Sequence, residues 1–312
     1  MRNSVSNSGL WARYVVVAAC WGTCYLWIKI GLRELSPLQV VFWRLFFSAG
    51  FLYAVLCWRK ETAYLFRVNG KHFFMMAFLS PFAPFLLVAW AQKYVDSGVA
   101  SILNGTTLLF GVVLSAIFLK DEPLTKRKII AVLIGFLGVM LLFQDNLVAS
   151  FWGGQVAGKL AVLLSSVSYG ACSVFARAKF KETPPAVQNT GVTLSAFAYV
   201  LCLAFFVEGG VVIPRLPLTW VAVLWLAIFG NVIAYSLYFS LLQQWGVARA
   251  ASVNYVYPLI GLVLGGVFLG EPMTVSLLLG AVLIVISVVI LKKSKGFSGA
   301  SPKNPLVSEQ SP

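Results

Sequence analysis

Charged side chains are scarce in this chain of 312 residues: Asp, Glu, Lys and Arg together make up 11% of it, whereas hydrophobic residues make up 60%. Soluble domains carry about 25% charged residues. Water cannot cover so much apolar surface, so the sequence predicts a protein whose solvent is the lipid bilayer. The longest polar stretches are the first ten residues and the tail from Lys292, which leaves no room for a soluble domain.

Acidic side chains are scarcer than basic ones, with ten Asp and Glu against 24 Lys and Arg, and all ten fall in predicted loops or at predicted helix ends. Pumps that carry cations on proton energy usually bury a carboxylate within the membrane. The lack of one disfavours a cation antiporter and favours a neutral, zwitterionic or anionic substrate. It also disfavours a membrane-embedded enzyme acting on lipids, which would need paired acids or a metal cluster.

Sequence motifs that bind metals or nucleotides are also scarce. Cys20 and Cys24 are one helical turn apart, but no His or third Cys lies nearby in sequence, so the five cysteines predict packing. Residues 153–159 approach a phosphate-binding P-loop, but Leu160 stands where the motif needs Ser or Thr. We therefore expect no metal, no cofactor and no ATP. The net charge of +14 does not indicate nucleic acid, because the bases cluster between apolar runs.

Ten apolar runs are long enough to cross a bilayer, for which a helix needs about 20 residues. They predict membrane helices over residues 12–30, 37–58, 72–92, 97–119, 128–143, 157–178, 185–207, 218–243, 250–269 and 275–291. The expected fold is therefore an all-α integral membrane protein with ten transmembrane helices. Prolines should break two of these helices, the third at Pro81 and Pro84 and the ninth at Pro258.

The sequence contains a repeat. Glu122-Pro123 and Glu271-Pro272 lie 149 positions apart, each in a short polar turn between two apolar helices. The match extends in both directions, so that five helices align with five. We expect two domains, residues 12–143 and 157–291, followed by a disordered cytoplasmic tail over residues 292–312.

The odd number of helices in each copy predicts that the copies are inserted in opposite orientations. Lys and Arg gather on the cytoplasmic side of a membrane, and most of the basic residues fall there if the N-terminus is inside. The first Glu-Pro turn is flanked by four basic residues between positions 120 and 128, whereas the second has none from Gly270 to Val275. The charges predict two inverted repeats with both termini inside (N-in/C-in), a common plan for secondary transporters.

Arg44 is the one basic residue deep within a predicted span. Burying a cation there costs about 2.5–3.5 kcal/mol on insertion scales. Two interpretations stay open. The guanidinium is bonded to carbonyl groups or reaches the membrane surface, or it is the counter-charge for a carboxylate or phosphate of the substrate.

Polar and aromatic residues at matched positions of the two copies mark the expected walls of a substrate cavity. Each of them has an alternative role in hydrogen bonding between helices or in anchoring at the membrane interface. The candidates for substrate binding, in addition to Arg44, are Trp21, Tyr25, Asn104, Thr107, Tyr169, Tyr235, Asn254 and Tyr255; further candidates for the walls are Asn231, Tyr238 and Tyr257.

These residues resemble the drug/metabolite transporter superfamily, and within it the ten-helix proteins made of two EamA-type domains. The resemblance is carried by Phe118-Leu-x-x-Glu122-Pro123, Phe268-Leu-Gly-Glu271-Pro272, Trp21-Gly22, Arg44 and Pro258-Leu-x-Gly, while Leu108 replaces the usual proline in the first copy. It implies a secondary carrier of the bacterial inner membrane, often an exporter of amino acids or related metabolites. Some relatives instead import or exchange metabolites such as S-adenosylmethionine.

The expected function is therefore transport, and the protein is not expected to be an enzyme. We expect a secondary-active or facilitative carrier that exports an amino acid or a derivative by alternating access, with export favoured over import by family resemblance alone. The alternatives are an importer or exchanger, a membrane-embedded lipid-modifying enzyme, and a receptor or scaffold without transport. The expected partners are a small-molecule substrate and the bilayer, and the sequence leaves the oligomeric state open.

Overall fold

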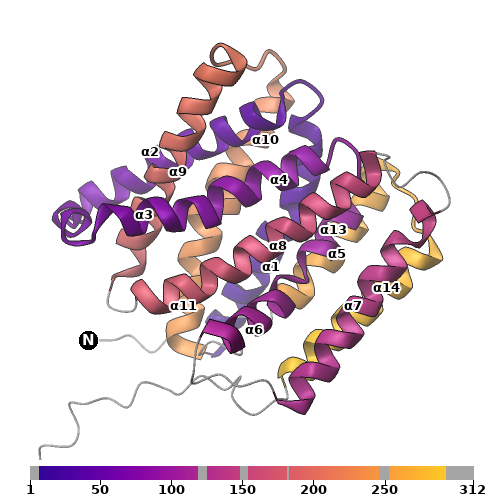
Figure 1. Cartoon of the computed structure of the whole chain (residues 1–312). Helices are drawn as coiled ribbons and strands as arrows, with labels where there is room; N and C mark the ends of the chain where they lie inside the picture. Colours follow the sequence, from indigo (N-terminus) through magenta and orange to yellow (C-terminus); the bar gives the residue numbers. More distant parts are fainter. Residues whose placement is uncertain (1–6, 119–124, 148–153, 181–182, 246–252, 293–312) are drawn as a thin grey trace, which may run out of the picture.

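The computed structural model describes residues 7–118, 125–147, 154–180, 183–245 and 253–292, and all regular structure in these segments is helical (Figure 1). The first copy holds α1 (Asn7–Gly31), α2 (Pro37–Trp58), η1 (Thr62–Arg67), α3 (Gly70–Ala77), η2 (Phe78–Phe82), α4 (Ala83–Ala91), α5 (Ser97–Asn104), α6 (Thr107–Phe118) and α7 (Lys126–Leu147). The second holds α8 (Gly154–Lys179), α9 (Pro185–Glu208), α10 (Pro217–Ala227), η3 (Ile228–Ile233), α11 (Ala234–Trp245), α13 (Val253–Leu269) and α14 (Val275–Lys292).

Local sequence signals set the helix ends. A helix satisfies its own backbone groups, which lipid cannot do, so an apolar run of this length folds as a helix. Proline stands at the first turn of α2, α9 and α10, where its missing N–H is not needed. Ser36 caps α2, because its Oγ accepts a hydrogen bond from the Gln39 N–H at 3.1 Å. Gly209, at φ 74°, ends α9.

Seven helical segments are long and apolar enough to cross a membrane, by length and composition, within the described residues. They are 8–31, 37–58, 70–91, 97–118, 154–176, 185–208 and 217–238, and two shorter apolar helices follow at 256–269 and 275–287. α7 lies beside α14 as a further helical segment. The expected all-α membrane fold with two repeats is confirmed, while the count of ten and the N-in/C-in orientation stay predictions.

Equivalent helices of the two copies run in opposite directions. The end of α1 lies beside the end of α4, because the Lys29 Nζ donates to the carbonyl groups of Gln92 at 2.7 Å and Val95 at 2.9 Å. The start of α8 is at the same place, where Gly154 lies against the Tyr94 ring. Glu271, after α13, is also here. We call this end of the bundle, which lies outside the cell in the predicted orientation, the Glu271 end.

Two matched glycine pairs bring the copies together. In the repeat, Gly22 aligns with Gly170 and Gly111 with Gly261. α1 crosses α13 where a Cβ on Gly22 would meet the Ile260 side chain at 2.6 Å and one on Gly261 would lie 3.5 Å from the Gly22 carbonyl oxygen. α6 crosses α8 where Gly111 faces Gly170. A Cβ at Gly170 would lie 2.9 Å from the Gly111 backbone nitrogen, so a side chain there would force the helices apart. Small residues permit this close approach of backbones in lipid.

Three membrane segments are interrupted, and proline explains only one of the breaks. η2 interrupts the third segment at Pro81, as expected, because proline lacks the N–H that a helix interior needs. α13 runs through Pro258 as one helix, so the predicted break there is wrong. The fourth segment instead divides at Gly105, where α5 packs on α13 and α6 on α8. The eighth segment contains the π-helical η3.

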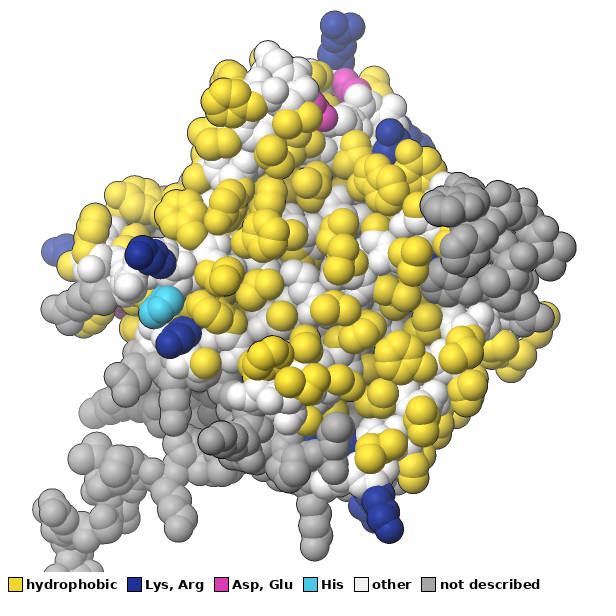
Figure 2. All heavy atoms as spheres, in the orientation of Figure 1, with side chains coloured by type: hydrophobic (Ala, Val, Ile, Leu, Met, Phe, Trp, Pro, Cys, Tyr) yellow, Lys and Arg dark blue, Asp and Glu magenta, His cyan; other side chains and the backbone are white. Residues whose placement is uncertain are grey.

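The face of the bundle seen in Figure 2 is rich in apolar side chains, and Lys and Arg lie toward its edges. α7 and α14 form an outlying pair in Figure 1 and cross at Gly138 and Gly280, where a Cβ on Gly138 would lie 2.9 Å from the Gly280 carbonyl oxygen. Exposed Leu133, Leu137 and Leu279 lie on this pair. A surface of this kind fits a multi-pass membrane protein, whose lipid-facing side chains replace a polar coat.

Candidate substrate site

Arg44 lies in α2, about two turns from Pro37, and only 5% of its surface is exposed. Its Cζ lies 3.6 Å from the centroid of the Phe85 ring, which comes from α4. The guanidinium donates no hydrogen bond to any residue that the structure describes, and its Nε is buried without a partner. A cation–π contact of a desolvated cation contributes about 2 kcal/mol. The charge and the donors of Arg44 are thus left for a group that is not part of the described chain.

A second buried donor belongs to the residue that follows Gly230, a glycine of η3 that lies against Arg44. A Cβ on Gly230 would lie 3.5 Å from the Arg44 Nη2 and 2.7 Å from the Cys24 Sγ, so a glycine is needed for η3 to approach this closely. The next residue, Asn231, is 2% exposed, and its Nδ2 has no partner. Buried polar groups are almost always hydrogen-bonded. Orphaned donors such as the Arg44 Nε and the Asn231 Nδ2 fit an acceptor-only group such as a carboxylate or phosphate.

Two tyrosine hydroxyls lie within electrostatic range of the guanidinium. Tyr169 of α8 and Tyr235 of α11 are both close enough to Arg44 to interact with its charge. Both residues are predicted site residues, and they come from two elements of the second copy, whereas Arg44 comes from the first. The site therefore lies between the copies.

Asn104 ties three helices together next to this site. Its Nδ2 donates to the Tyr25 Oη at 2.7 Å, and its Oδ1 accepts from the Ser165 and Ser166 Oγ atoms at 3.2 Å each. Asn104 is the last residue of α5, Tyr25 lies in α1 and the two serines in α8. Both the Nδ2 and the Oδ1 of the Asn104 amide are thus hydrogen-bonded, and the bond to the Tyr25 hydroxyl fixes the position of the Tyr25 ring.

Aromatic rings continue the site toward α11. The Trp21 ring lies 5.4 Å from Tyr235, 5.1 Å from Tyr238 and 6.3 Å from Tyr257, measured between centroids. Tyr257 also stacks on Tyr25 with 6.3 Å between centroids and 12° between planes. Such pairs contribute about 0.5–1.5 kcal/mol each beyond the area that they bury. The rings form one wall that a planar or apolar group could contact.

The structure brings most of the predicted site residues together. Trp21, Tyr25, Arg44, Asn104, Tyr169 and Tyr235 form one connected cluster from five helical segments. Thr107 is different, because its Oγ1 donates to the Asn104 carbonyl group at 2.7 Å and supports the break in the fourth segment. Asn254 lines a small cavity with Ile102, Pro258 and Ile284 between α5, α13 and α14. The Tyr255 side chain lies outside the described residues.

Several residues of the cluster were not predicted as binding residues. Asn231, Tyr238 and Tyr257 were expected in the cavity wall only, and Phe85, Ser165 and Ser166 were not expected there at all. A hydroxyl pair in an apolar helix was the one signal that could have found the two serines. Phe85 is one of 24 phenylalanines, and nothing in its sequence context distinguishes it.

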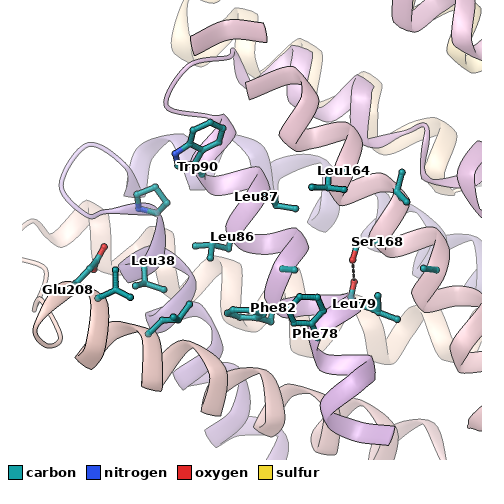
Figure 3. Close-up of a pocket in the computed structure, with 16 residues that line it drawn as sticks. Leu38, Phe78, Leu79, Phe82, Leu86, Leu87, Trp90, Leu164, Ser168 and Glu208 are labelled. Atoms are coloured by element: carbon teal, nitrogen blue, oxygen red, sulfur yellow. Dashed lines mark hydrogen bonds between the residues drawn. The ribbon is translucent and has the colours of Figure 1, made fainter. Parts of the chain in front are cut away.

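A cavity with a volume of about 790 Å³ forms a groove between α2, α4, α8 and α9 (Figure 3). Leu38, Phe82, Leu86 and Leu164 line it, and its lining is almost wholly apolar. Ser168 donates from its Oγ to the Leu79 carbonyl group at 2.9 Å and so uses its own polar group. The carboxylate of Glu208 at one end of the groove accepts hydrogen bonds from Ser36 and Gln39. The groove offers no cation to a carboxylated metabolite, and its apolar lining fits hydrocarbon better than such a substrate.

Removing the Tyr25 hydroxyl tests the architecture of the cluster. In Tyr25→Phe the buried Asn104 amide loses a partner, and we expect a loss of about 0.6–2 kcal/mol in the free energy of unfolding. Thermal unfolding in detergent would measure it, with Tyr53→Phe on the exposed face of α2 as the control. In a double-mutant cycle with Asn104→Leu the two losses should be less than additive. Equal unfolding temperatures for the two Phe variants would show that the bond does not stabilise the fold.

A helical membrane protein in two inverted copies, with a buried polar cluster between them, has the architecture of a secondary carrier. The model of the EamA-like transporter family matches residues 9–144 and again residues 156–292. The chain belongs to this family, and it holds two EamA repeats.

Relatives match over most of the chain. It is 24% identical over 274 residues to the uncharacterized transporter YoaV of Bacillus subtilis, covering 86% of this chain and 92% of YoaV. It is 27% identical over 297 residues to the uncharacterized inner membrane transporter YedA of Escherichia coli K12, covering 94% and 92%. Protein PagO of Salmonella typhimurium is 24% identical over 282 residues, covering 88% and 90%. One crystal structure superposes with a TM-score of 0.67 at 22% identity over 92% of this chain and 97% of its own, which shows a shared fold.

Proposed function

We propose that this protein is a secondary-active or facilitative carrier that exports a small metabolite bearing a carboxylate, an amino acid or a derivative of one, across the bacterial inner membrane. The observation that carries the proposal is the buried guanidinium of Arg44, which donates no hydrogen bond to the described residues and lies between the two copies. Similarity to YedA, an inner membrane transporter by name, supports the proposed location in the inner membrane.

Arg44 selects the substrate by charge in this proposal. A planar guanidinium binds a carboxylate through two parallel hydrogen bonds, and these bonds are strong because both partners are charged. Asn231 adds a third donor, and the Tyr169 and Tyr235 hydroxyls can complete the polar shell. The cluster contains no carboxylate, so a substrate with an excess of positive charge is rejected by Arg44.

The aromatic wall binds the remainder of the substrate. Trp21, Tyr235 and Tyr257 present ring faces and edges to one volume, and such surfaces contact apolar or planar groups at little cost in conformational entropy. Tyr25 and Asn104 hold the wall in place. Thr107, Asn254 and Tyr255 are assigned weaker roles at the margin of the site.

Transport itself follows from the inverted copies. Two arrangements of the same unit, related by exchange of the copies, open the site in turn to the two sides of the membrane. In the proposed N-in/C-in topology with ten crossings, the cell interior holds both termini and the tail from residue 292. The domains over residues 12–143 and 157–291 are the two moving parts.

Metabolite profiling of cells and medium tests both the substrate and the direction. A strain that overproduces the protein should release one or a few carboxylated metabolites into the medium, and a deletion strain should retain them in the cell. Purified protein in liposomes should then carry the radiolabelled form of the same compound. Depletion of the medium in place of enrichment would establish import or exchange. The absence of flux for every amino acid tested, together with unchanged profiles, would contradict transport of this substrate class.

A further inference from the structure

The carboxylate of Glu271 holds the start of α5. Its Oε1 accepts a hydrogen bond from the Ser97 N–H at 2.7 Å, and its Oε2 accepts from the Ser97 Oγ at 2.8 Å and from the Gly98 N–H at 3.0 Å. The first N–H groups of a helix have no partner within the helix, and the helix dipole favours a negative charge there. Glu271 belongs to the second copy and α5 to the first, so these three bonds join the copies.

The chain around Glu271 is shaped for this contact. Gly270 has a φ of 66°, which glycine adopts without strain, and the Glu271 N–H donates to the Gly265 carbonyl oxygen at 3.2 Å. This turn reverses the chain after α13. The Glu271 side chain then lies directly over Gly265, where a Cβ would overlap with its carboxylate and would come within 2.7 Å of the Ser97 Oγ. The glycines at 265 and 270 are thus both required for the Glu271 contact.

The contact between α5 and α13 continues from Glu271 into the bundle. A Cβ on Gly98 would lie 3.4 Å from the Leu262 Cα, and one on Gly261 would lie 2.6 Å from the Ser101 Cβ. The Ser101 Oγ donates to the Pro258 carbonyl group at 3.0 Å. The next residue along α13, Tyr257, already belongs to the aromatic wall. The α5–α13 contact therefore closes the candidate site toward the Glu271 end.

Toward the opposite end the same two segments separate. α6, which continues the span of α5, packs on α8 through Gly111 and Gly170, and it has no extensive contact with α13 within the described residues. The cluster of Tyr25, Asn104 and Tyr257 lies where the segments part. The inverted repeat would permit the reverse arrangement, with a contact near the start of α13 and a separation at the Glu271 end.

We propose that Glu271 is the latch of the gate at the Glu271 end: its bonds to Ser97 and Gly98 hold α5 on α13, and their release opens the substrate site to that side of the membrane. The inference rests on the proposed transport by alternating access. It assigns to Glu271 a positioning role, because the carboxylate acts on the gate helices and does not contact the substrate. Its counterpart by sequence in the first copy, Glu122, lies outside the described residues.

Asp96 provides a matched comparison because it is the adjacent carboxylate. It precedes α5, makes no side-chain capping bond, and has a raised pKa because of its burial and the nearby Glu271 carboxylate, an effect that Lys29 and Lys159 oppose. Asp96→Asn removes the same charge as Glu271→Gln at almost the same place, but it removes no bond between α5 and α13. It also removes a repulsion on Glu271, so it should not open the gate.

Distance measurements between spin labels test the latch without any substrate. Labels at Lys93→Cys and Val275→Cys, both exposed, would report the separation across the Glu271 end, with the exposed Cys57 and Cys202 replaced by serine. Glu271→Gln should raise the ratio of long to short distances by roughly tenfold or more, the change expected from one lost charge-assisted hydrogen bond. Glu271→Ala, which removes all three bonds, should raise it further, and Ser97→Ala, which removes one, should raise it least. Asp96→Asn should match the parent protein.

Distance distributions for both Glu271 variants that coincide with the parent would overturn the latch, whatever the flux. An equal shift for Asp96→Asn would also overturn it, because charge alone would then open the gate. If Glu271→Gln does not yield folded protein, the shift of Ser97→Ala decides in the same way. A shift as expected in a protein that carries no metabolite would leave the latch standing and overturn the proposed function alone.

Discussion

Arg44→Ala should lower transport of the carboxylated substrate by roughly 30-fold or more. Removing one partner of a buried, hydrogen-bonded charge pair costs about 2–5 kcal/mol, and each 1.4 kcal/mol is tenfold in affinity. The fold should survive the change, because the guanidinium makes no hydrogen bond within the described residues and its main contact is the Phe85 ring. We expect the unfolding temperature without substrate to be equal to that of the parent or higher.

Two variants make the Arg44 result specific. Arg44→Lys keeps the charge but loses the planar pair of donors, so it should retain weak transport. Arg215→Ala removes an exposed cation at the Glu271 end and should leave transport unchanged. Flux of a radiolabelled amino acid into liposomes measures transport. The increase in unfolding temperature that the same compound gives measures substrate binding. Full stabilisation of Arg44→Ala by the substrate would show that Arg44 does not bind it.

Gly170→Leu should prevent the protein from folding into a single stable form. A Cβ at Gly170 would already lie 2.9 Å from the Gly111 nitrogen and 3.1 Å from the Phe110 carbonyl carbon, and these backbone atoms cannot turn aside as a side chain can. Overpacking costs about 1–3 kcal/mol in cores that can adjust. We expect more here, because α6 and α8 must separate along their crossing. Size-exclusion chromatography in detergent and thermal unfolding would detect the loss.

Gly50→Leu is the matched control for this crossing. Gly50 lies on the exposed face of α2, and a Cβ there has no neighbour within 4 Å. The same substitution should therefore leave the elution profile and the unfolding temperature as they are in the parent. Gly170→Leu protein that elutes and unfolds like Gly50→Leu protein would contradict the close crossing of α6 and α8.

The membrane fold and its duplication could be predicted because the composition and the spacing of residues in the sequence indicate both. Apolar runs long enough to cross a bilayer indicate membrane helices. The recurrence of Glu-Pro, and of Gly22 as Gly170, shows the repeat directly. Arg44 was found because a cation within an apolar run is rare enough to require an explanation. Each of these signals belongs to a residue and its neighbours in sequence.

The parts that were missed depend on contacts between distant segments. No proline near Gly105 predicts the division of the fourth segment. The division arises because α5 packs mainly on α13 and α6 packs on α8. Pro258 lies within the continuous helix α13, so a proline did not suffice to interrupt the ninth segment. From the sequence, Glu271 is expected only in a short polar turn between two apolar helices. Its partner Ser97 lies 174 positions away, beyond any sequence pattern within one copy.

The paired glycine crossings have a consequence for how such a chain can arise. α1 of the first copy crosses α13 of the second close to Gly22 and Gly261, and the equivalent helices α8 and α6 cross close to Gly170 and Gly111 with the copies exchanged. Residue i contacting j while j contacts i is the rule of an isologous interface, the kind found in a symmetric dimer. The two crossings of this single chain thus have the arrangement of an interface in an antiparallel homodimer whose subunits are joined by a linker. A substitution that improves the packing at one crossing has an equivalent position at the other, so the same substitution can be made at both.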